Sequence, residues 1–336
     1  MQECGRRVVP GSQPELWQHN VTKRAHYRNL VQCGQVWLCP VCAAKITQRR
    51  REELQGGMDR FQGASVLGTV TVQHHVGGSL VQVKRILEFA WDRTIGGRQY
   101  RRMCAKYAII GQVTSLEVTY SNDNGWHPHK HFALFLWRPL SAGQLANLEA
   151  DLSNLWTYQV KAVGGWVLAP YGCQVERSSA SVAEYLTKWG PDYDANELAH
   201  SLADRTLAGT WKLSDELTRA NVKKAHRGGR NPFQLLESYL AGDQQAGALF
   251  REYAAAMKGC HQLQWSRGLR VLLGLDLERS DQETVEQVEQ DCTLLYRFNK
   301  EQWKAVLSNE CLTIMLDAAE TLEQSDLEAL IMSLAC

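Results

Sequence analysis

Three histidines at alternate positions, followed directly by a continuous apolar run, constrain the fold of this chain more than any other segment. His127, His129 and His131 occupy every second position, and residues 132–137 read Phe-Ala-Leu-Phe-Leu-Trp. Because alternate residues of a β-strand project from one face, a strand here places the imidazoles of His129 and His131 side by side. Neutral imidazoles grouped in this way can share a divalent cation. The alternative is a chance cluster of histidines near the end of a strand.

A second strand and a turn precede these histidines. Residues 108–120 are rich in β-branched side chains and lead into Ser-Asn-Asp-Asn-Gly at 121–125, a typical hairpin turn. A three-residue Asp-Asn-Gly loop with Gly125 in the left-handed region places Glu117 opposite His131 and on the same face. A two-residue Asn-Gly loop turns Glu117 to the other face, as an ordinary solvent-facing strand residue. We predict the first loop, and with it a glutamate and two histidines whose open coordination positions suit a catalytic cation.

A short helix is predicted further along the chain. Residues 181–189 read Ser-Val-Ala-Glu-Tyr-Leu-Thr-Lys-Trp, and Gly190-Pro191 ends the segment. Tyr185 and Lys188 are three residues apart and therefore share a helical face. A tyrosine hydroxyl titrates near ~10, so it becomes a nucleophile only beside an ammonium group and a polarised phosphate. Tyr-x-x-Lys is common on surface helices, and only the histidine strand makes this pair informative.

Together these segments resemble the HUH endonucleases, and more closely the single-tyrosine replication initiators of rolling-circle plasmids. Three motifs of that family occur in the expected order: an apolar strand ending in Thr-Val-Thr at 67–72, the long block at 117–131, and Tyr-x-x-Lys at 185–188. The middle block is specific and the other two are short. Residues 264–269 also resemble the family, so the likeness covers roughly residues 1–275.

The resemblance implies a catalytic cation site. In it, His129 and His131 are ligands of Mg²⁺ or Mn²⁺, and Glu117 is the third ligand, with His127 as its substitute. The cation would hold the scissile phosphate of single-stranded DNA.

The resemblance also implies a nucleophile, Tyr185, assisted by Lys188. Attack by this tyrosine leaves a 5′-phosphotyrosyl adduct and a free 3′-hydroxyl, and a later strand transfer closes the circle. Some relatives carry a carboxylate one helical turn before the tyrosine, where this chain has Ser181. The residue that activates water for the terminating cleavage therefore stays open.

Four cysteines near the start of the chain indicate a structural zinc site. Cys39-x-x-Cys42 has zinc-knuckle spacing, and Cys4 and Cys33 can complete a four-thiolate tetrahedron, with His26 as an alternative fourth ligand. A redox-active or merely buried cluster is the alternative, but the segment lacks the βαβ pattern of thioredoxin-like motifs. The remaining cysteines show no ligand spacing and, without a signal peptide, indicate free thiols in a reducing compartment.

Charge is unevenly distributed along the chain, although its formal sum is only +1. Residues 1–60 carry ten basic and five acidic side chains, which favours attraction to phosphate in this part of the chain. A basic run after the last of the four cysteines is either a solvated helix face or a DNA contact; it consists of Lys45, Arg49, Arg50 and Arg51. A mixed aromatic and basic segment could likewise stack on and neutralise single-stranded DNA, or form an ordinary buried tryptophan with an exposed arginine; it consists of Trp265, Arg267 and Arg270.

The C-terminal region is acidic, with three basic and twelve acidic side chains in residues 280–336. Apolar residues at three- and four-residue spacing predict amphipathic helices over 283–298 and 301–333. Such a region would repel DNA, so we expect it to pack on its own protein, to pair protomers in a homo-oligomer, or to bind a host factor.

The predicted fold class is α+β: an HUH nuclease domain with an antiparallel sheet backed by helices, a zinc-binding element before it and a helical region after it. Strands are expected near 64–75, 108–121, 128–137 and 167–177, and helices near 79–105, 140–160 and 180–189. The expected domains are a cysteine-rich element, the endonuclease and a mainly helical region with the acidic tail, at 1–58, 59–215 and 216–336.

The resulting expectation is a metal-dependent enzyme that nicks and rejoins single-stranded or supercoiled origin DNA, with a host DNA polymerase and helicase as partners. No stretch approaches the ~20 apolar residues of a membrane span, so we expect no membrane partner and a cytoplasmic, nucleoid-associated protein in a bacterial host. One alternative is an HUH transposase or relaxase, although the chain has no Gly-x-x-x-x-Gly-Lys-Ser/Thr loop. Another is a non-catalytic, zinc-dependent DNA-binding regulator.

Overall fold

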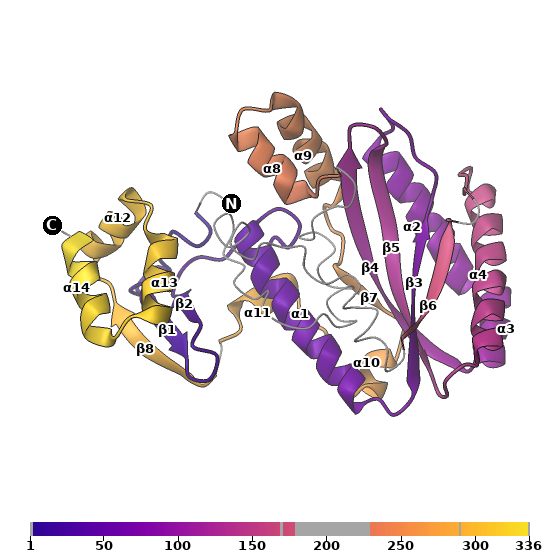
Figure 1. Cartoon of the computed structure of the whole chain (residues 1–336), viewed down its shortest axis with the longest axis horizontal. Coiled ribbons are helices and arrows are strands. Elements are labelled where there is room, and N and C mark those ends of the chain that lie inside the picture. Colours follow the sequence, from indigo (N-terminus) through magenta and orange to yellow (C-terminus); the bar gives the residue numbers. More distant parts are fainter. Residues whose placement is uncertain (1–2, 169–170, 179–228, 289, 335–336) are drawn as a thin grey trace. The chain divides into compact units, whose positions relative to one another are not determined.

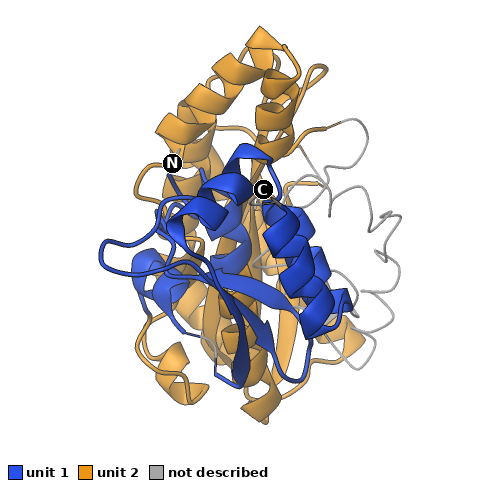
Figure 2. Ribbon diagram, turned by 90° about the vertical axis from the view of Figure 1, so that its left-hand side faces the viewer, with its two compact units in different colours: residues 1–46, 196–205, 279–336 blue, residues 47–195, 206–278 orange. Residues whose placement is uncertain are grey.

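The fold comes from a computed structural model that describes residues 3–168, 171–178, 229–288 and 290–334. These residues form two compact units (Figure 2). The described residues up to 46 and from 279 onward make the first unit, and the other described residues make the second.

The second unit contains a five-stranded antiparallel sheet of strand order β6-β3-β5-β4-β7 (Figure 1). Its strands are β3 (Ala64–Thr71), β4 (Ile109–Ser121), β5 (Gly125–Leu136), β6 (Cys173–Ser178) and β7 (Leu263–Trp265). The long hairpin of β4 and β5 lies at the centre of the sheet, where nearly every residue is buried. The sequence predicted four of these strands, whereas β7 is too short to produce an alternating pattern.

Three helices pack on one face of this sheet (Figure 1). They are α2 (Leu80–Gly96), α3 (Arg98–Tyr107) and α4 (Ala142–Ala162). Trp91 of α2 stacks on Phe132 of β5 with ring centroids 5.3 Å apart and contacts Trp156 of α4 edge-on. Ser141 begins α4 with a capping box, in which its hydroxyl accepts from the Gln144 backbone amide.

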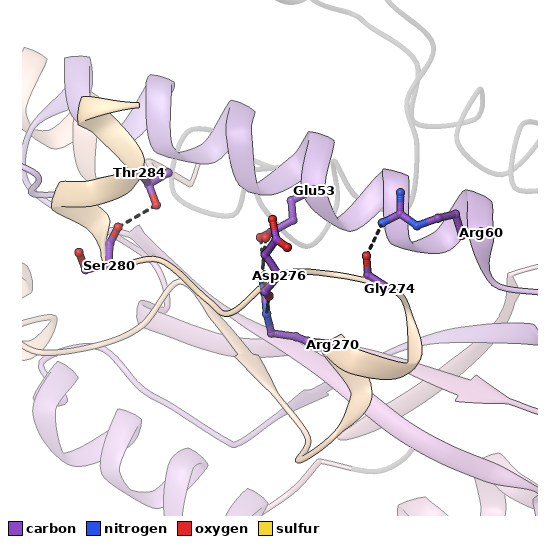
Figure 3. Close-up of polar contacts among 7 residues, drawn as sticks. All are labelled: Glu53, Arg60, Arg270, Gly274, Asp276, Ser280 and Thr284. Atoms are coloured by element: carbon purple, nitrogen blue, oxygen red, sulfur yellow. Dashed lines mark hydrogen bonds and ion pairs between the residues drawn. The ribbon is translucent and has the colours of Figure 1, made fainter. Parts of the chain in front are cut away.

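The opposite face of the same sheet packs on α1 (Pro40–Arg60) and α10 (Leu269–Leu272). Val113, Ala133 and Phe135 point to this side and form a core with apolar residues of the two helices. Arg270 donates to Glu53 of α1 over 3.1 Å (Figure 3). The Arg270 guanidinium also lies 5.1 Å from the centre of the Trp265 ring. Arg270 therefore links α1 to Trp265 of β7. The sequence suggested contact with DNA for these two residues, and the fold gives them a structural role.

A helical hairpin, α8 (Pro232–Leu240) and α9 (Gln244–Ala256), also belongs to the second unit. Asn231 caps α8, since its side chain accepts from the backbone amide of Gln234, and Pro232 occupies the first turn. Tyr120 and Arg230 form an isolated β-bridge that ties the hairpin to β4.

The first unit joins the two ends of the chain. Its three-stranded antiparallel sheet has the order β2-β1-β8, with β1 (Glu15–His19), β2 (Ala25–Arg28) and β8 (Cys292–Arg297). The helices of this unit are α11 (Asp281–Glu286), α12 (Lys300–Ser308), α13 (Leu312–Thr321) and α14 (Gln324–Leu334). Leu16, Phe298, Trp303 and Met315 lie at the centre of its core.

One expectation for the C-terminal region changes as a result. The helix predicted over 283–298 is wrong, because only residues 281–286 are helical and residues 292–297 form β8. Apolar residues such as Leu294 also fit a strand, and pairing with β1 selects that state. The three expected domains, at 1–58, 59–215 and 216–336, stay a prediction.

The α+β class, with helices near the C-terminus, is confirmed. Within the part of the chain that the structure describes, no helix is both long and apolar enough to cross a lipid bilayer.

Candidate metal centres

The β4–β5 hairpin brings one glutamate and two histidines together. Its loop consists of residues 122–124, because Ser121 pairs with Gly125, whose φ is +73°. This register pairs Glu117 with His129, so the predicted pairing with His131 is wrong by two residues. The loop begins one residue earlier than expected. A shift of two leaves the side chain on the same face, and the predicted face of Glu117 is correct.

The three side chains converge at a single carboxylate oxygen. Glu117 Oε2 lies 2.9 Å from His129 Nε2 and 2.8 Å from His131 Nε2. One ligand atom from each residue lies within 4.8 Å of the others, and Glu117 and His131 are buried. A carboxylate oxygen with two imidazole nitrogens suits a divalent cation that accepts oxygen and nitrogen ligands, and the donor set fits such an ion.

Charges within the cluster favour an ionised carboxylate. Burial alone would disfavour the charged form of Glu117, but the imidazoles of His129 and His131 hold the pKa of that carboxyl well below its usual range. The carboxylate is therefore available as an anionic ligand at neutral pH.

His127 lies next to this cluster and is not part of it. Its Nε2 lies 3.2 Å from the hydroxyl of Thr71, and its ring stacks on His74 with centroids 4.4 Å apart. Burial, together with the neighbouring His129, lowers the pKa of His127 to about 3. Glu117 and His127 were the two candidates for the third ligand, and the fold places Glu117 beside His129 and His131.

Sequence reasoning assigned no role to Thr69, which contacts the cluster. Its Oγ1 lies 3.0 Å from His131 Nδ1, because β3 pairs with β5 in a register that places Thr69 opposite His131. The Thr-Val-Thr motif was the available signal, but this contact depends on strand pairing.

The four N-terminal cysteines form a second cluster. The sulfur atoms of Cys4 and Cys42 are 3.4 Å apart, and the Cys33–Cys42 and Cys39–Cys4 sulfur distances are both 3.6 Å. Four thiolates at about 2.3 Å from zinc lie about 3.8 Å from one another in a tetrahedron, so these residues fit a zinc ion. His26 lies on β2, where it accepts a hydrogen bond from Arg28, and the four sulfurs form the cluster without it.

The basic run on α1 divides between buried and half-buried positions. Arg50 is 5% exposed and donates to Gln262, so its expected role in DNA contact is not what the fold shows. The reason is helical periodicity, since Arg50 shares a face with the buried Ile46 and Leu54. The half-buried members of the run are Lys45, Arg49 and Arg51.

Two predicted site residues, Tyr185 and Lys188, lie outside the residues that the structure describes, as does Ser181. Their placement relative to the histidine strand stays a prediction.

The described residues thus belong to an α+β protein with two clusters that can each hold a metal ion. Within that class the chain is similar to "Protein rep" of Streptomyces lividans, at 27% identity over 306 residues that cover 74% of this chain and 64% of the relative. It is also similar to "Neomycin resistance protein" of Streptomyces cyanogenus, at 29% identity over 129 residues and 30% of each chain. The first similarity confirms the resemblance to replication initiators.

The chain thus spans less than two thirds of the length of Protein rep. No family model matches it, and no solved structure matches it.

Proposed function

We propose that this chain is a rolling-circle replication initiator that nicks and rejoins single-stranded origin DNA. The observation that carries the proposal is the convergence of Glu117, His129 and His131 on central strands, in a chain similar to Protein rep. Long, buried strands hold these side chains in fixed geometry, as a preorganised site requires.

Each residue has a distinct task in the proposed reaction. Glu117, His129 and His131 would hold Mg²⁺ or Mn²⁺, and the bound ion would supply Lewis-acid stabilisation of charge on the scissile phosphate. The hydroxyl oxygen of Tyr185 would form a bond to phosphorus as the bond to the 3′ oxygen breaks, and that oxygen would take up a proton. Lys188 would favour loss of the proton from the tyrosine hydroxyl.

The adduct explains why rejoining would need no ATP. One phosphodiester is exchanged for another, the 5′-phosphotyrosyl bond, so the free energy of the broken linkage is retained. A host polymerase would extend the free 3′-hydroxyl while a helicase unwinds the template, and attack by a later hydroxyl would release Tyr185.

The cysteine cluster has a structural role in this proposal. Zinc held by Cys4, Cys33, Cys39 and Cys42 would tie the chain before β1 to the start of α1. Metal sites made of four thiolates have no open position for a substrate, so catalysis is assigned to the other cluster.

A covalent adduct is the decisive test. The full chain, loaded with zinc, is incubated with Mn²⁺ and with labelled single-stranded oligonucleotides that tile the DNA around its coding sequence. We expect an SDS-resistant adduct that mass spectrometry assigns to Tyr185. Tyr185→Phe and His129→Ala should abolish it, while the matched control Tyr158→Phe, at a 65% exposed tyrosine of α4, should retain it.

The outcomes also distinguish the alternatives. Specific DNA binding without any adduct would overturn the proposal in favour of a zinc-dependent DNA-binding regulator. An adduct that resolves only by transfer to a second DNA molecule would instead favour a transposase or relaxase.

A further inference from the structure

Two threonines of β3 contact two different histidines of β5. Thr69 Oγ1 lies 3.0 Å from His131 Nδ1, and Thr71 Oγ1 lies 3.2 Å from His127 Nε2. The antiparallel register places Thr69 directly opposite His131 and Thr71 opposite His129. The Thr71 contact is therefore diagonal, to the histidine two residues before its paired one. Residues 69 and 71 share a face of the strand, and this is the face that carries Glu117.

The first contact fixes the orientation of a candidate ligand. His131 is held at both ring nitrogens, with Nδ1 at Thr69 and Nε2 at Glu117, 2.8 Å away. A histidine that gives Nε2 to a cation carries its proton on Nδ1, and a hydrogen bond at Nδ1 selects that tautomer. The Thr69 hydroxyl is placed to accept that proton's hydrogen bond.

The second contact has the opposite consequence. His127 Nε2 is directed to the Thr71 hydroxyl, and its ring is stacked on His74 at an interplanar angle of 24°. The ring centroid of His127 is 5.0 Å from that of His129. A third imidazole thus lies close to the cluster while its Nε2 is held by the Thr71 hydroxyl.

We propose that the Thr-Val-Thr segment determines which histidines form the cation site: Thr69 positions His131, and Thr71 withholds His127. The inference rests on the cation site of the proposed function and adds the selection of its ligands. Two residues of one type, spaced two apart, therefore have different roles because each meets a different ring nitrogen.

Manganese binding, measured without DNA, tests the role of Thr69. The full chain, loaded with zinc, is titrated with Mn²⁺ while free Mn²⁺ is followed by electron paramagnetic resonance. Thr69→Val keeps the shape and strand propensity but removes the hydroxyl, and we expect roughly 10–100-fold weaker binding. Thr69→Ser, which restores the hydroxyl, should recover affinity to within about threefold. Binding by Thr69→Val equal to wild type would overturn this half.

A double-mutant cycle tests the role of Thr71. His127→Ala should leave Mn²⁺ affinity unchanged in the wild-type background and lower it in the Thr71→Val background, where the imidazole is released. Equal weakening in both backgrounds, or no effect in either, would overturn the second half. Thermal unfolding of each variant checks that the fold is retained.

Failure of the inference is distinguishable from failure of the proposed function. If Glu117→Gln and His129→Ala leave Mn²⁺ affinity unchanged, the cation site itself is refuted, and the proposed function and the inference are refuted with it. If they weaken binding while Thr69→Val does not, only the role of Thr69 is refuted.

Discussion

Single residues of the two clusters hold their protons differently. Glu117 is ionised because two imidazoles flank its carboxyl, even though it is buried. Burial raises the pKa of the Cys4 thiol to about 12, and the pKa of the Cys42 thiol is also raised, first by its hydrogen bond with Cys39 and then by burial. The Glu117 carboxylate is therefore available as an anionic ligand at neutral pH, whereas the thiols must lose protons when zinc binds.

Zinc affinity should depend steeply on pH. Because zinc binds thiolates and the Cys4 thiol is protonated at neutral pH, protons compete with the metal and affinity falls as pH falls. Between pH 7.5 and 6.5 we expect more than about tenfold weaker binding, measured by competition with a chromophoric chelator. Cys104→Ser, outside the cluster, should leave the profile unchanged, and a flat profile would contradict four-thiolate binding.

Arg50 should matter for stability and not for DNA affinity. Its guanidinium is buried against Gln262, so Arg50→Ala should lower the free energy of unfolding by about 1–3 kcal/mol in denaturant titrations. The control Arg138→Ala, at an exposed arginine, should change it by less than about 0.5 kcal/mol. Normal stability with a reduced salt dependence of DNA binding would instead show that Arg50 contacts phosphate.

At the scale of elements, the β4–β5 hairpin determines which face Glu117 occupies. The turn depends on Gly125, whose φ is +73° and whose position leaves no room for a side chain. A Cβ there would lie 2.6 Å from the His75 carbonyl oxygen. The conformation of one residue thus fixes the register of eleven paired positions, from Gly111 to Ser121.

Gly125→Ala should weaken both the hairpin and the cation site. The left-handed conformation alone costs about 1–2 kcal/mol for a residue with a Cβ, and the contact with His75 adds to it. We expect a lower melting temperature and weaker Mn²⁺ binding. Gly143→Ala is the matched control, because that helical glycine of α4 has open space around it, and the change should be neutral or stabilising by up to ~1 kcal/mol. Equal effects at both positions would refute this account of the turn.

At the scale of the whole molecule, each of the two units has its own core. In the first unit, the N-terminal strands pack on the acidic C-terminal helices, and Trp303 donates from its indole to the Arg6 carbonyl oxygen. The acidic region therefore packs on its own protein, one of the three expectations for it. Its negative charge lies in the same unit as the four cysteines.

Zinc removal should act on the first unit alone. We expect two unfolding transitions in calorimetry, since each unit has a separate core. A zinc chelator should lower the midpoint temperature of only one of them. Trp303→Ala should lower the midpoint temperature of the same transition, because loss of a buried tryptophan costs about 3–5 kcal/mol in free energy of unfolding. Trp156→Ala, in the second unit, should lower the midpoint of the other transition. A single transition that responds to all three changes would contradict two separate cores.

Local patterns in the sequence predicted most of the elements near the site. Apolar runs and turn residues predicted β3, β4, β5 and β6, because these signals depend on neighbouring residues. The strand β8 was missed because its three- and four-residue spacing also fits a helix. Arg50 was misjudged because its charge outweighed its position on a buried helical face.

The sequence by itself determined the α+β class, the alternation that presents His129 and His131 together, and the cysteines that form one cluster. Only the tertiary structure decided that Glu117 pairs with His129, that Thr69 contacts His131, and that the two chain ends share a sheet. The physical reason is range. Side-chain direction along a strand or helix follows from backbone geometry, whereas register and partner depend on packing between residues that are distant in the chain.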